Sequence, residues 1–376
     1  MKSFHEKTFD PGTQLKLALF RGYIREWIPV FFTQANSSHL TKVNFYDFFA
    51  GPGHDVDKNP GTPLIILEEI KQYCASNQQL MNSSVSMVFN DKNKQHIETL
   101  QSLISDVRCD KNCCKFNFSH LPFQEAFFYH LSSMEGSNAA NLIILDQFGV
   151  KEVTPEIIRH LAMCRRTDVL FFISSAFIRR FIDTPELSEK FKDLTADAVK
   201  DVEYNAIHRT ICSYFQTQLK DIEYYLAPFS IRKNSNIYGV IFGSSNLLGL
   251  EKFLKVCWAI DPITGEANYN IDGDFAAWSK QPSLFAKLNS VKKIDIFKKD
   301  LETFISKKSP NNHDVYKYSL MRGFPPKKAN EVLKVIQKNE NFKVITIKDG
   351  TFARKGAFYL SFDALKDAPK VQYVIG

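Results

Sequence analysis

Short apolar runs alternate along the first half of this chain with stretches in which apolar residues recur every three or four positions. The runs have the length of buried strands, and the stretches between them have the period of amphipathic helices. The runs predict strands at 43–46, 86–89, 114–118, 142–145 and 169–173, with helices at 62–73, 92–104, 123–132 and 155–164. Apolar strands separated by helices are typical of a parallel sheet covered on both faces.

One more helix is expected ahead of the first strand, over residues 13–32. Its apolar stripe repeats every four residues, and Lys16 and Arg25 lie off that stripe. The residues of the stripe are Leu15, Leu19, Tyr23 and Trp27. The pattern predicts a helix that buries one face against the sheet.

The alternation changes after Phe177. Residues 184–220 are charged and helical in pattern, which predicts an insertion or cap. Residues 224–231 and 237–242 bracket the turn-rich segment 232–236 and predict a β-hairpin, followed by a helix at 249–260. The sheet is therefore expected to end in an antiparallel pair.

Residues 295–376 are predicted to form a second domain, separate from residues 1–294. An amphipathic helix at 326–339 precedes expected strands at 342–347 and 357–362, with a turn at Asp349-Gly350. A helix followed by a two-stranded ribbon in a basic context predicts a winged helix-turn-helix. The alternative is an α+β appendage that packs on the body or forms a dimer contact.

The charge is uneven along the chain. The whole sequence carries a net +7, while residues 279–376 hold 20 Lys and Arg against 9 Asp and Glu. The C-terminal part is thus strongly basic on a mildly acidic body. This asymmetry predicts an anionic partner, with nucleic acid as the first candidate. A lysine-rich solvated surface is the other interpretation.

No apolar run reaches the ~18 residues of a membrane span. The N-terminus lacks the apolar core of a signal peptide, so we expect a cytoplasmic protein. The seven cysteines are scattered, and Cys109, Cys113 and Cys114 are their one cluster in the sequence. No nearby Cys or His completes a zinc pattern, so reduced thiols and no metal are predicted.

The first predicted strand ends in Asp47 and leads into a phenylalanine- and glycine-rich loop. The loop contains Phe49, Ala50, Gly51 and Gly53, and these residues with Asp47 are the candidates for holding a nucleotide cofactor. Glycine there lets the backbone turn sharply and approach a nucleotide cofactor. Dinucleotide folds usually have G-x-G-x-x-G, whereas D-x-F-A-G-x-G resembles the first motif of S-adenosylmethionine-dependent methyltransferases, whose sheets also end in an antiparallel pair. The simpler interpretation is a glycine-rich turn.

Further cofactor contacts are expected after the second and third strands. Asp91 follows the second strand, where a carboxylate commonly accepts from both hydroxyls of a ribose. Its distance of 38 residues from Gly53 exceeds that of a compact unit, and the loop 54–61 accounts for part of it. Asp91 as a helix N-cap is the alternative. Phe123 and Gln124 follow the third strand, where side chains commonly contact adenine.

The fourth predicted strand ends in Asp146-Gln-Phe-Gly149, where ligands of α/β sheets bind. Asp146 and Phe148 are the candidates for orienting a methyl acceptor, through a hydrogen bond and ring stacking. Amino-methyltransferases of DNA carry [D/N]-P-P-[Y/F] here, and this chain lacks both prolines. Asp146 as a structural cap of the strand is the alternative.

Several motifs together resemble the three-Cys-motif partner proteins, a bacterial family encoded in mobile or prophage-like regions. They are Thr13-x-x-Lys16 with Tyr23-x-x-x-Trp27, Phe45 to Gly53, Gly61-Thr-Pro63, Leu145 to Gly149, Asp261 to Glu266 and Gly323 to Leu333. The resemblance implies a methyltransferase-like fold and a partner protein with three clustered cysteines, similar to radical S-adenosylmethionine proteins. That family usually has proline where this chain has Gln147.

The sequence thus predicts an α/β protein with a Rossmann-like class I methyltransferase sheet and a small basic winged-helix-like module. The expected function is S-adenosylmethionine-dependent methylation of DNA or RNA. The module would contact phosphates through Lys327, Lys328, Arg354 and Lys355. The alternatives are a scaffold without catalysis, which binds nucleic acid or the partner protein, and a nucleotide-binding oxidoreductase.

Overall fold

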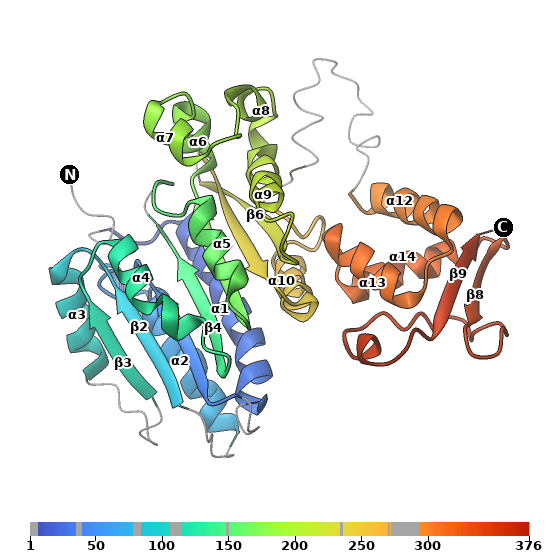
Figure 1. Cartoon of the computed structure of the whole chain (residues 1–376), viewed down its shortest axis with the longest axis horizontal. Helices are drawn as coiled ribbons and strands as arrows, with labels where there is room; N and C mark the ends of the chain where they lie inside the picture. Colours follow the sequence, from blue (N-terminus) through green and yellow to red (C-terminus); the bar gives the residue numbers. More distant parts are fainter. Residues whose placement is uncertain are drawn as a thin grey trace. The chain divides into compact units, whose positions relative to one another are not determined.

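The computed structural model describes residues 7–34, 40–77, 84–105, 114–147, 150–233, 236–269, 271 and 293–375. Contacts divide the chain into two compact units, Met1–Gly249 and Leu250–Gly376 (Figure 1). Within the described ranges, no helix has the length and apolar character needed to cross a membrane.

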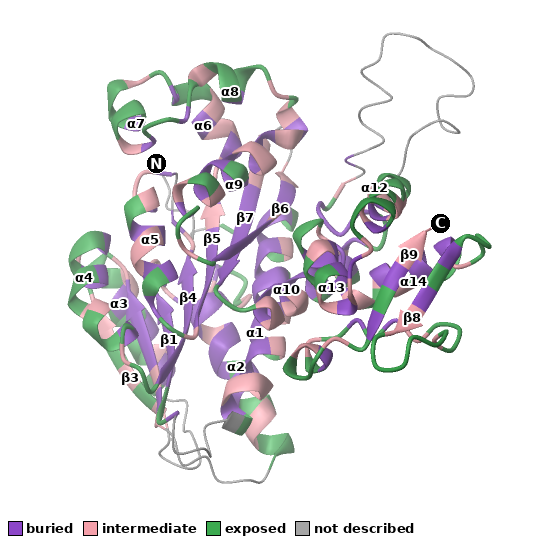
Figure 2. Cartoon of the chain, turned by 45° about the vertical axis from the view of Figure 1, so that its right-hand side comes forward, coloured by how far each residue is buried: buried purple, intermediate pink, exposed green. Residues whose placement is uncertain are grey.

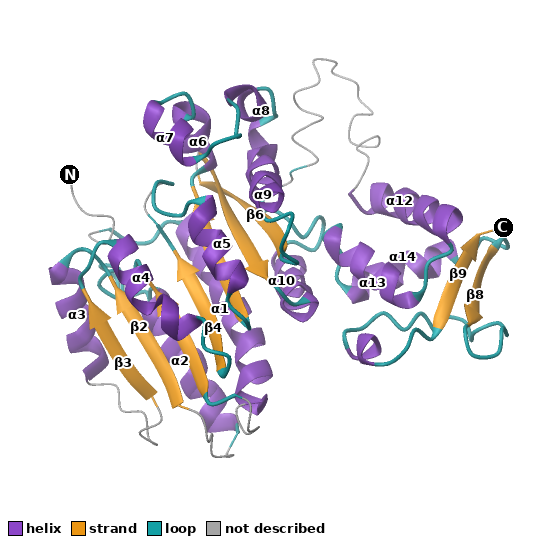
Figure 3. Ribbon diagram, in the orientation of Figure 1, coloured by secondary structure: helices purple, strands orange, loops and turns teal. Residues whose placement is uncertain are grey.

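The first unit is built, over its described residues, on a seven-stranded sheet of order β3-β2-β1-β4-β5-β7-β6 (Figure 3). β1 to β5 are parallel, and β7 runs antiparallel to both β5 and β6. The strands are β1 (Lys42–Asp47), β2 (Ser84–Asn90), β3 (Cys114–Ser119), β4 (Ala139–Leu145), β5 (Thr167–Ile173), β6 (Tyr225–Lys233) and β7 (Asn236–Ser244). This is a Rossmann-like α/β sheet, and it ends in the antiparallel hairpin that the sequence predicts.

Helices cover both faces of the sheet. On one face the Trp27 ring of α1 lies 5.1 Å from the ring of Phe45 on β1, and α2 packs beside α1. On the other face, the Phe215 ring of α9 lies 5.2 Å from that of Phe171 on β5, in a core shared with α4 and α5. The helices are α1 (Pro11–Gln34), α2 (Thr62–Ser76), α3 (Lys94–Ser105), α4 (Phe123–Met134), α5 (Pro155–Met163), α6 (Ser175–Phe181), α7 (Pro185–Lys190), α8 (Ala196–Lys200), η2 (Tyr204–Ala206) and α9 (Ile207–Gln218).

The segment 184–220, which the sequence predicts as a helical insertion or cap, divides into two parts. The short helices α7 and α8 are largely exposed (Figure 2). In α9, by contrast, Ile207, Ile211 and Phe215 are buried in the core. α9 therefore belongs to the layer that covers the sheet. α6 is absent from the predicted elements because its apolar run continues that of β5.

The second unit packs helices against a small antiparallel sheet. Trp258 of α10 donates its indole N–H to the Gly323 carbonyl at 2.8 Å, and its ring lies 5.3 Å from Phe324. These contacts join α10 to the helices of this compact unit, which begins at Leu250, whereas the sequence predicts a second domain over residues 295–376. The elements are α10 (Leu247–Ile260), α12 (Lys293–Lys308), α13 (Asn312–Met321), α14 (Pro326–Ile336), β8 (Phe342–Thr346), η3 (Asp363–Lys366) and β9 (Val371–Ile375).

The predicted strand at 357–362 is wrong. The partner of β8 is β9, which pairs Val344 with Tyr373. Tyr359 has a positive φ of 53°, which extended strands do not adopt. The apolar alternation there arises instead from Phe358 and Leu360, which are buried without strand pairing. The winged helix stays a prediction.

A buried carboxylate connects α1 to the sheet. Asp168 on β5 is 5% exposed and accepts a hydrogen bond of 2.7 Å from the Tyr23 hydroxyl of α1. The Ser244 hydroxyl at the end of β7 also bonds to it. Burial raises the pKa of Asp168 to about 6, although these hydrogen bonds oppose the rise.

This carboxyl should make the stability of the protein depend on pH. Its folded pKa lies above the unfolded value near ~4, so its stabilising contribution is complete below that value and is lost as the pH rises through about 6. The difference in unfolding free energy between wild type and Asp168→Asn should shift by about 2 kcal/mol between pH 4 and 7.5, in favour of the variant at high pH. Urea denaturation measures this. Asp183→Asn, at an exposed pair with Lys200, is the control, and parallel curves for wild type and Asp168→Asn would contradict the prediction.

Candidate functional site

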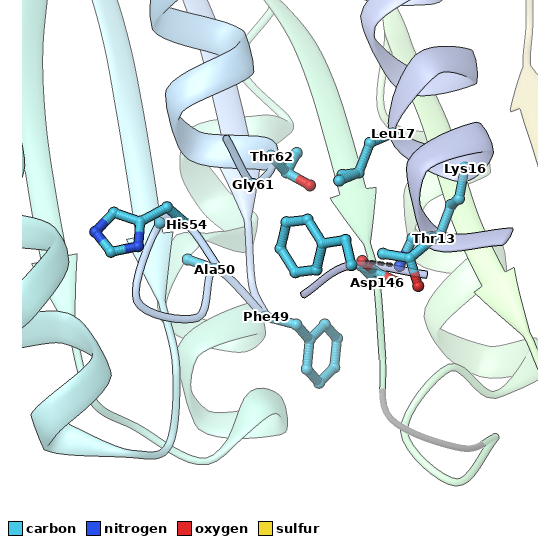
Figure 4. Close-up of a pocket in the computed structure, with 11 residues that line it drawn as sticks. Thr13, Lys16, Leu17, Phe49, Ala50, His54, Gly61, Thr62 and Asp146 are labelled. Atoms are coloured by element: carbon cyan, nitrogen blue, oxygen red, sulfur yellow. Dashed lines mark hydrogen bonds and ion pairs between the residues drawn. The ribbon is translucent and has the colours of Figure 1, made fainter. Parts of the chain in front are cut away.

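A cleft of about 820 Å³ opens in the first unit at the carboxyl ends of the parallel strands. Ligands of α/β sheets bind at this edge, and ligand pockets span roughly 300–1,000 Å³. The cleft is lined by residues that follow β1, β2, β3, β4 and β5, and by Thr13 and Lys16 of α1. A smaller cavity of about 30 Å³ lies between α1 and the loop after β1 (Figure 4).

The loop after β1 adopts the backbone expected of its glycines. Gly51 and Gly53 have φ of 61° and 93°, which favour glycine. A Cβ on Gly53 would lie 2.8 Å from Cδ1 of Leu100. The Gly61 N–H donates to the Gly53 carbonyl at 2.7 Å, and the Ala50 N–H donates to the Asn90 carbonyl at 2.9 Å. The loop is therefore held against both α2 and β2.

Asp47, predicted to hold the cofactor, ends β1 and is 1% exposed. Its Oδ1 accepts from the Phe49 N–H at 3.1 Å, and its Oδ2 has no hydrogen-bond partner among the described residues. Burial raises the pKa of Asp47 to about 8, and the nearby carboxylates Asp146 and Asp91 add to the rise. An acceptor atom of this kind is stabilised by a ligand that supplies a donor.

Asp91 lies just beyond β2 and lines the same cleft. Its Oδ2 accepts from the Gly51 N–H at 3.0 Å and its Oδ1 from the Asn93 N–H at 2.8 Å. Asp91 thus links the glycine loop to the start of α3. It lies at the position predicted for a ribose contact, and it also accepts from the backbone at the N-terminus of α3, which is the alternative role. The residue before it, Asn90, was not predicted. Its amide bonds to the Phe48 and Leu121 carbonyls and joins the loops after β1 and β3.

Aromatic side chains from two loops form one wall of the cleft. The rings of Phe49 and Phe123 stack with centroids 5.0 Å apart and an interplanar angle of 26°. Phe48 packs edge-on against Phe123 at 5.7 Å, and Gln124 adds a polar group to the lining. The structure therefore brings together Phe49, Phe123 and Gln124, which the sequence predicts as cofactor contacts, on the cleft with Asp47 nearby.

Lys16 is the main residue that the sequence interpretation missed. It is 6% exposed and forms an ion pair with Asp146 at the end of β4 (Figure 4). Its Nζ lies 4.7 Å from the centroid of the Phe172 ring. The helical period placed Lys16 off the apolar stripe, but the first turns of α1 line the cleft, so this polar face is buried there. The Thr13-x-x-Lys16 spacing was the available signal.

Gln147, which follows Asp146, has a structural role. It is 1% exposed, and its Oε1 accepts from the Glu152 and Val153 N–H groups at 3.0 and 3.2 Å. Its Nε2 donates to the Phe172 carbonyl at 3.3 Å. This amide holds the loop after β4 against β5, a role that proline lacks the side-chain groups to fill. Phe148, the other predicted acceptor residue, lies outside the described residues.

The far end of the cleft carries a second aromatic wall. Phe172 of β5 and Tyr238 of β7 stack with centroids 5.3 Å apart at 17°, and Phe177 of α6 lines the same region. No motif marks these residues in the sequence, because strands that are distant along the chain bring them together.

The predicted basic contacts all lie in the second unit. Lys327, Arg354 and Lys355 are exposed. Lys328 is half-buried, with its Nζ 3.3 Å from Glu331 and 5.0 Å from the Trp258 ring centroid. Of the cysteine cluster, Cys114 lies at the start of β3, and Cys109 and Cys113 lie outside the described residues. The described part of the chain holds no group of His, Cys, Asp and Glu suited to a metal ion.

No family model and no curated protein sequence matches this chain. Among solved structures, it is similar to Trm1 from Pyrococcus horikoshii in complex with S-adenosyl-L-methionine, at 9% identity and a TM-score of 0.36. The similarity covers 68% of this chain and 61% of Trm1, which is less than two thirds of that protein.

Two further similar structures are methyltransferases. Magnesium protoporphyrin IX methyltransferase (ChlM) from Synechocystis PCC 6803 with bound SAM is 10% identical over 63% of this chain and 85% of that one, with a TM-score of 0.31. A putative O-methyltransferase from Klebsiella pneumoniae is 9% identical over 62% and 90%, with a TM-score of 0.31. The fold is assigned from the strand order of the sheet, because these identities and TM-scores are low.

The ion pair of Lys16 should stabilise the fold more than a surface pair does. Lys16→Met leaves Asp146 without its cation in a largely enclosed site, whereas Lys151→Met breaks the exposed pair with Glu186. We expect losses of about 2 kcal/mol for Lys16→Met and under about 1 kcal/mol for Lys151→Met in urea denaturation at pH 7. Equal losses in the two variants would show that the cleft pair is solvated like a surface pair.

Proposed function

We propose that this chain is an S-adenosylmethionine-dependent methyltransferase. The observation that carries the proposal is the Asp47 carboxylate, buried beside the glycine loop with one oxygen unpaired among the described residues. An ammonium donor satisfies such an oxygen with a charge-assisted hydrogen bond. S-adenosylmethionine carries this group on its methionine part, so the residues present fit the cofactor.

The other residues of the cleft suit the rest of the same cofactor. Asp91 uses two of its acceptor positions for the Gly51 and Asn93 N–H groups, and a carboxylate offers about four. It can therefore also accept from a ribose diol. The stacked rings of Phe49 and Phe123 offer an apolar surface for adenine, and Gln124 a polar contact at its edge.

When bound, S-adenosylmethionine supplies an electrophilic methyl group. The chain's own residues would contribute binding, orientation and exclusion of water, which carry most of the rate in such a transfer. In this proposal the Asp146 carboxylate, paired with Lys16, accepts a hydrogen bond from an N–H of the acceptor. Phe172 and Tyr238 give that end of the cleft a flat aromatic wall, which suits a planar acceptor.

We further propose that the acceptor is a nucleic acid. The proposal is supported by the excess of 20 basic over 9 acidic residues in 279–376 and by the exposure of Lys327, Arg354 and Lys355. A winged-helix-like role for the second unit belongs to the same proposal. A bacterial mobile-element context and a partner protein with three clustered cysteines rest on the sequence resemblance alone.

A methyltransferase-like scaffold without catalysis is the second candidate. It is favoured by Asp146, whose carboxylate is already paired with Lys16, and by Gln147, whose hydrogen bonds go to the backbone. An Asp146→Ala variant with full biological activity, alongside an inactive Asp47→Ala variant, would favour this candidate over the enzyme.

Calorimetric titration with S-adenosylmethionine tests the cofactor site directly. We expect micromolar binding to the wild type and a loss of binding in Asp47→Ala and Asp91→Ala. An absence of binding up to millimolar concentrations of the cofactor would contradict the proposed cofactor site. An assay of tritiated methyl transfer to nucleic acid then tests the reaction. We expect transfer by the wild type and none by Asp146→Asn.

The cofactor affinity should depend on pH through Asp47. Its pKa is about 8, and an ammonium ligand binds the ionised carboxylate better, so the affinity should rise roughly tenfold between pH 6.5 and 8. Asp47→Asn should bind more weakly and with a flat pH profile. Asp183→Asn, outside the cleft, should follow the wild type, and a wild-type profile without slope would contradict the assignment.

Nucleic-acid binding should weaken steeply with salt. Each phosphate contact contributes a slope of about −0.9 in a plot of log affinity against log salt concentration on duplex DNA. Replacing both Arg354 and Lys355 with Ala should therefore reduce the slope by about 2. Lys298→Ala, in the i,i+4 pair with Glu302 on α12, is the control. A slope that the double variant does not alter would exclude these two residues from the contact.

A further inference from the structure

The second unit presents one aromatic side chain on a rigid hairpin. The hairpin, residues 342–353, is closed by the Thr346 N–H to the Thr351 carbonyl and by the Ala353 N–H to the Val344 carbonyl, both at 2.8 Å. An isolated bridge pairs Phe352 with Ile345 of β8. The Asp349 carboxylate accepts from the Thr351 N–H at 3.1 Å and fixes the turn. The backbone that carries Phe352 is thus ordered before any ligand binds.

Phe352 is 70% exposed, in contrast to the neighbouring rings of the same sheet. Phe342 and Tyr373 point inward and are 6% and 0% exposed. Figure 2 shows the loops beside β8 as exposed. In the same unit, Ile347 and Tyr359 are 51% and 44% exposed. A large ring that is exposed on a hydrogen-bonded hairpin is available to a ligand with a flat apolar face.

One cation lies over this ring, and two more follow in the same segment. Lys343 Nζ lies 5.8 Å from the Phe352 centroid, and Arg354 and Lys355 are two and three positions after Phe352 in the chain. The Gly356 N–H donates to the Gln337 side chain at 3.1 Å, which holds this basic segment beside the end of α14. Among the described residues, no carboxylate forms an ion pair with Lys343, Arg354 or Lys355. The exposed Glu340 is the nearby acid in sequence, and Asp349 is bonded within the turn.

We propose that this surface, made of Phe352, Lys343, Arg354 and Lys355, binds a single-stranded nucleic acid. Phe352 stacks on an unpaired base, and the three cations contact the flanking phosphates. The partner follows from charge complementarity. A cation over an exposed ring, with two exposed basic residues just after it in the chain, suits a polyanion that also offers flat apolar faces. Bases within a duplex stack on one another and hide those faces. The inference deepens the proposed function and rests on its nucleic-acid acceptor.

Fluorescence anisotropy with a labelled 15-nucleotide oligodeoxythymidylate tests the proposal on the full chain. Phe352→Ala should bind this strand roughly 5- to 100-fold more weakly, since stacking is worth about that much per base. Binding to a duplex of equal length should change by less than about twofold. Tyr129→Ala, which removes an aromatic ring that is 75% exposed on the first unit, is the matched control and should bind like the wild type.

A Phe352→Trp variant gives a second measurement that a structural role would not affect. It should retain the affinity, and its exposed indole should be quenched when the oligonucleotide stacks on it. Normal single-strand binding by Phe352→Ala, or an unquenched indole at saturation, would overturn the stacking inference while leaving a phosphate-binding surface intact. Failure of the wild type to bind either nucleic acid would remove the proposed acceptor as well. Titration with S-adenosylmethionine would still decide the cofactor site separately.

Discussion

The parallel pairing of β1 with both β2 and β4 is the constraint on which the site depends. Asp47 is level with Phe89 of β2 and Ile144 of β4 in the two registers. Because the three strands run in the same direction, the residues just beyond their ends gather at one edge of the sheet. The register therefore gathers Asp47, Asp91 and Asp146 at one edge of the sheet, although about 100 residues separate the first from the last. Asp91 and Asp146 line the cleft, and Asp47 is buried at the end of β1.

Three carboxylates at one edge repel one another, and the fold compensates for each in a different way. Asp146 is paired with Lys16 of α1, and Asp91 accepts from two backbone N–H groups. Asp47 is left with one unpaired oxygen among the described residues, and burial raises its pKa to about 8. Of the three carboxyl groups, Asp47 beside the glycine loop is therefore the one whose buried oxygen, unpaired among the described residues, is left for a ligand to bond.

The loop after β4 illustrates how a departure from a family motif can be structural. Gln147 uses both ends of its amide, toward the Glu152 and Val153 N–H groups and the Phe172 carbonyl. The same carbonyl belongs to the residue whose ring lies under Lys16. One side chain therefore fixes the loop that carries Asp146 relative to the aromatic wall at the far end of the cleft. Glutamine in place of the family's proline at position 147 therefore changes how the loop after β4 is held.

Local pattern determined much of this protein. The apolar runs of β1 to β5, the glycines after β1 and the acids at the strand ends are readable in the sequence, because strand burial and positive φ depend on the residues themselves. Three features depended on tertiary structure. Lys16 is buried because the first turns of α1 line the cleft, and Phe172 and Tyr238 meet because β5 pairs with β7. β9 takes the place expected of residues 357–362 because long-range pairing outweighs local alternation. Contacts between distant segments leave no periodic trace in the chain, so only the folded structure decides them.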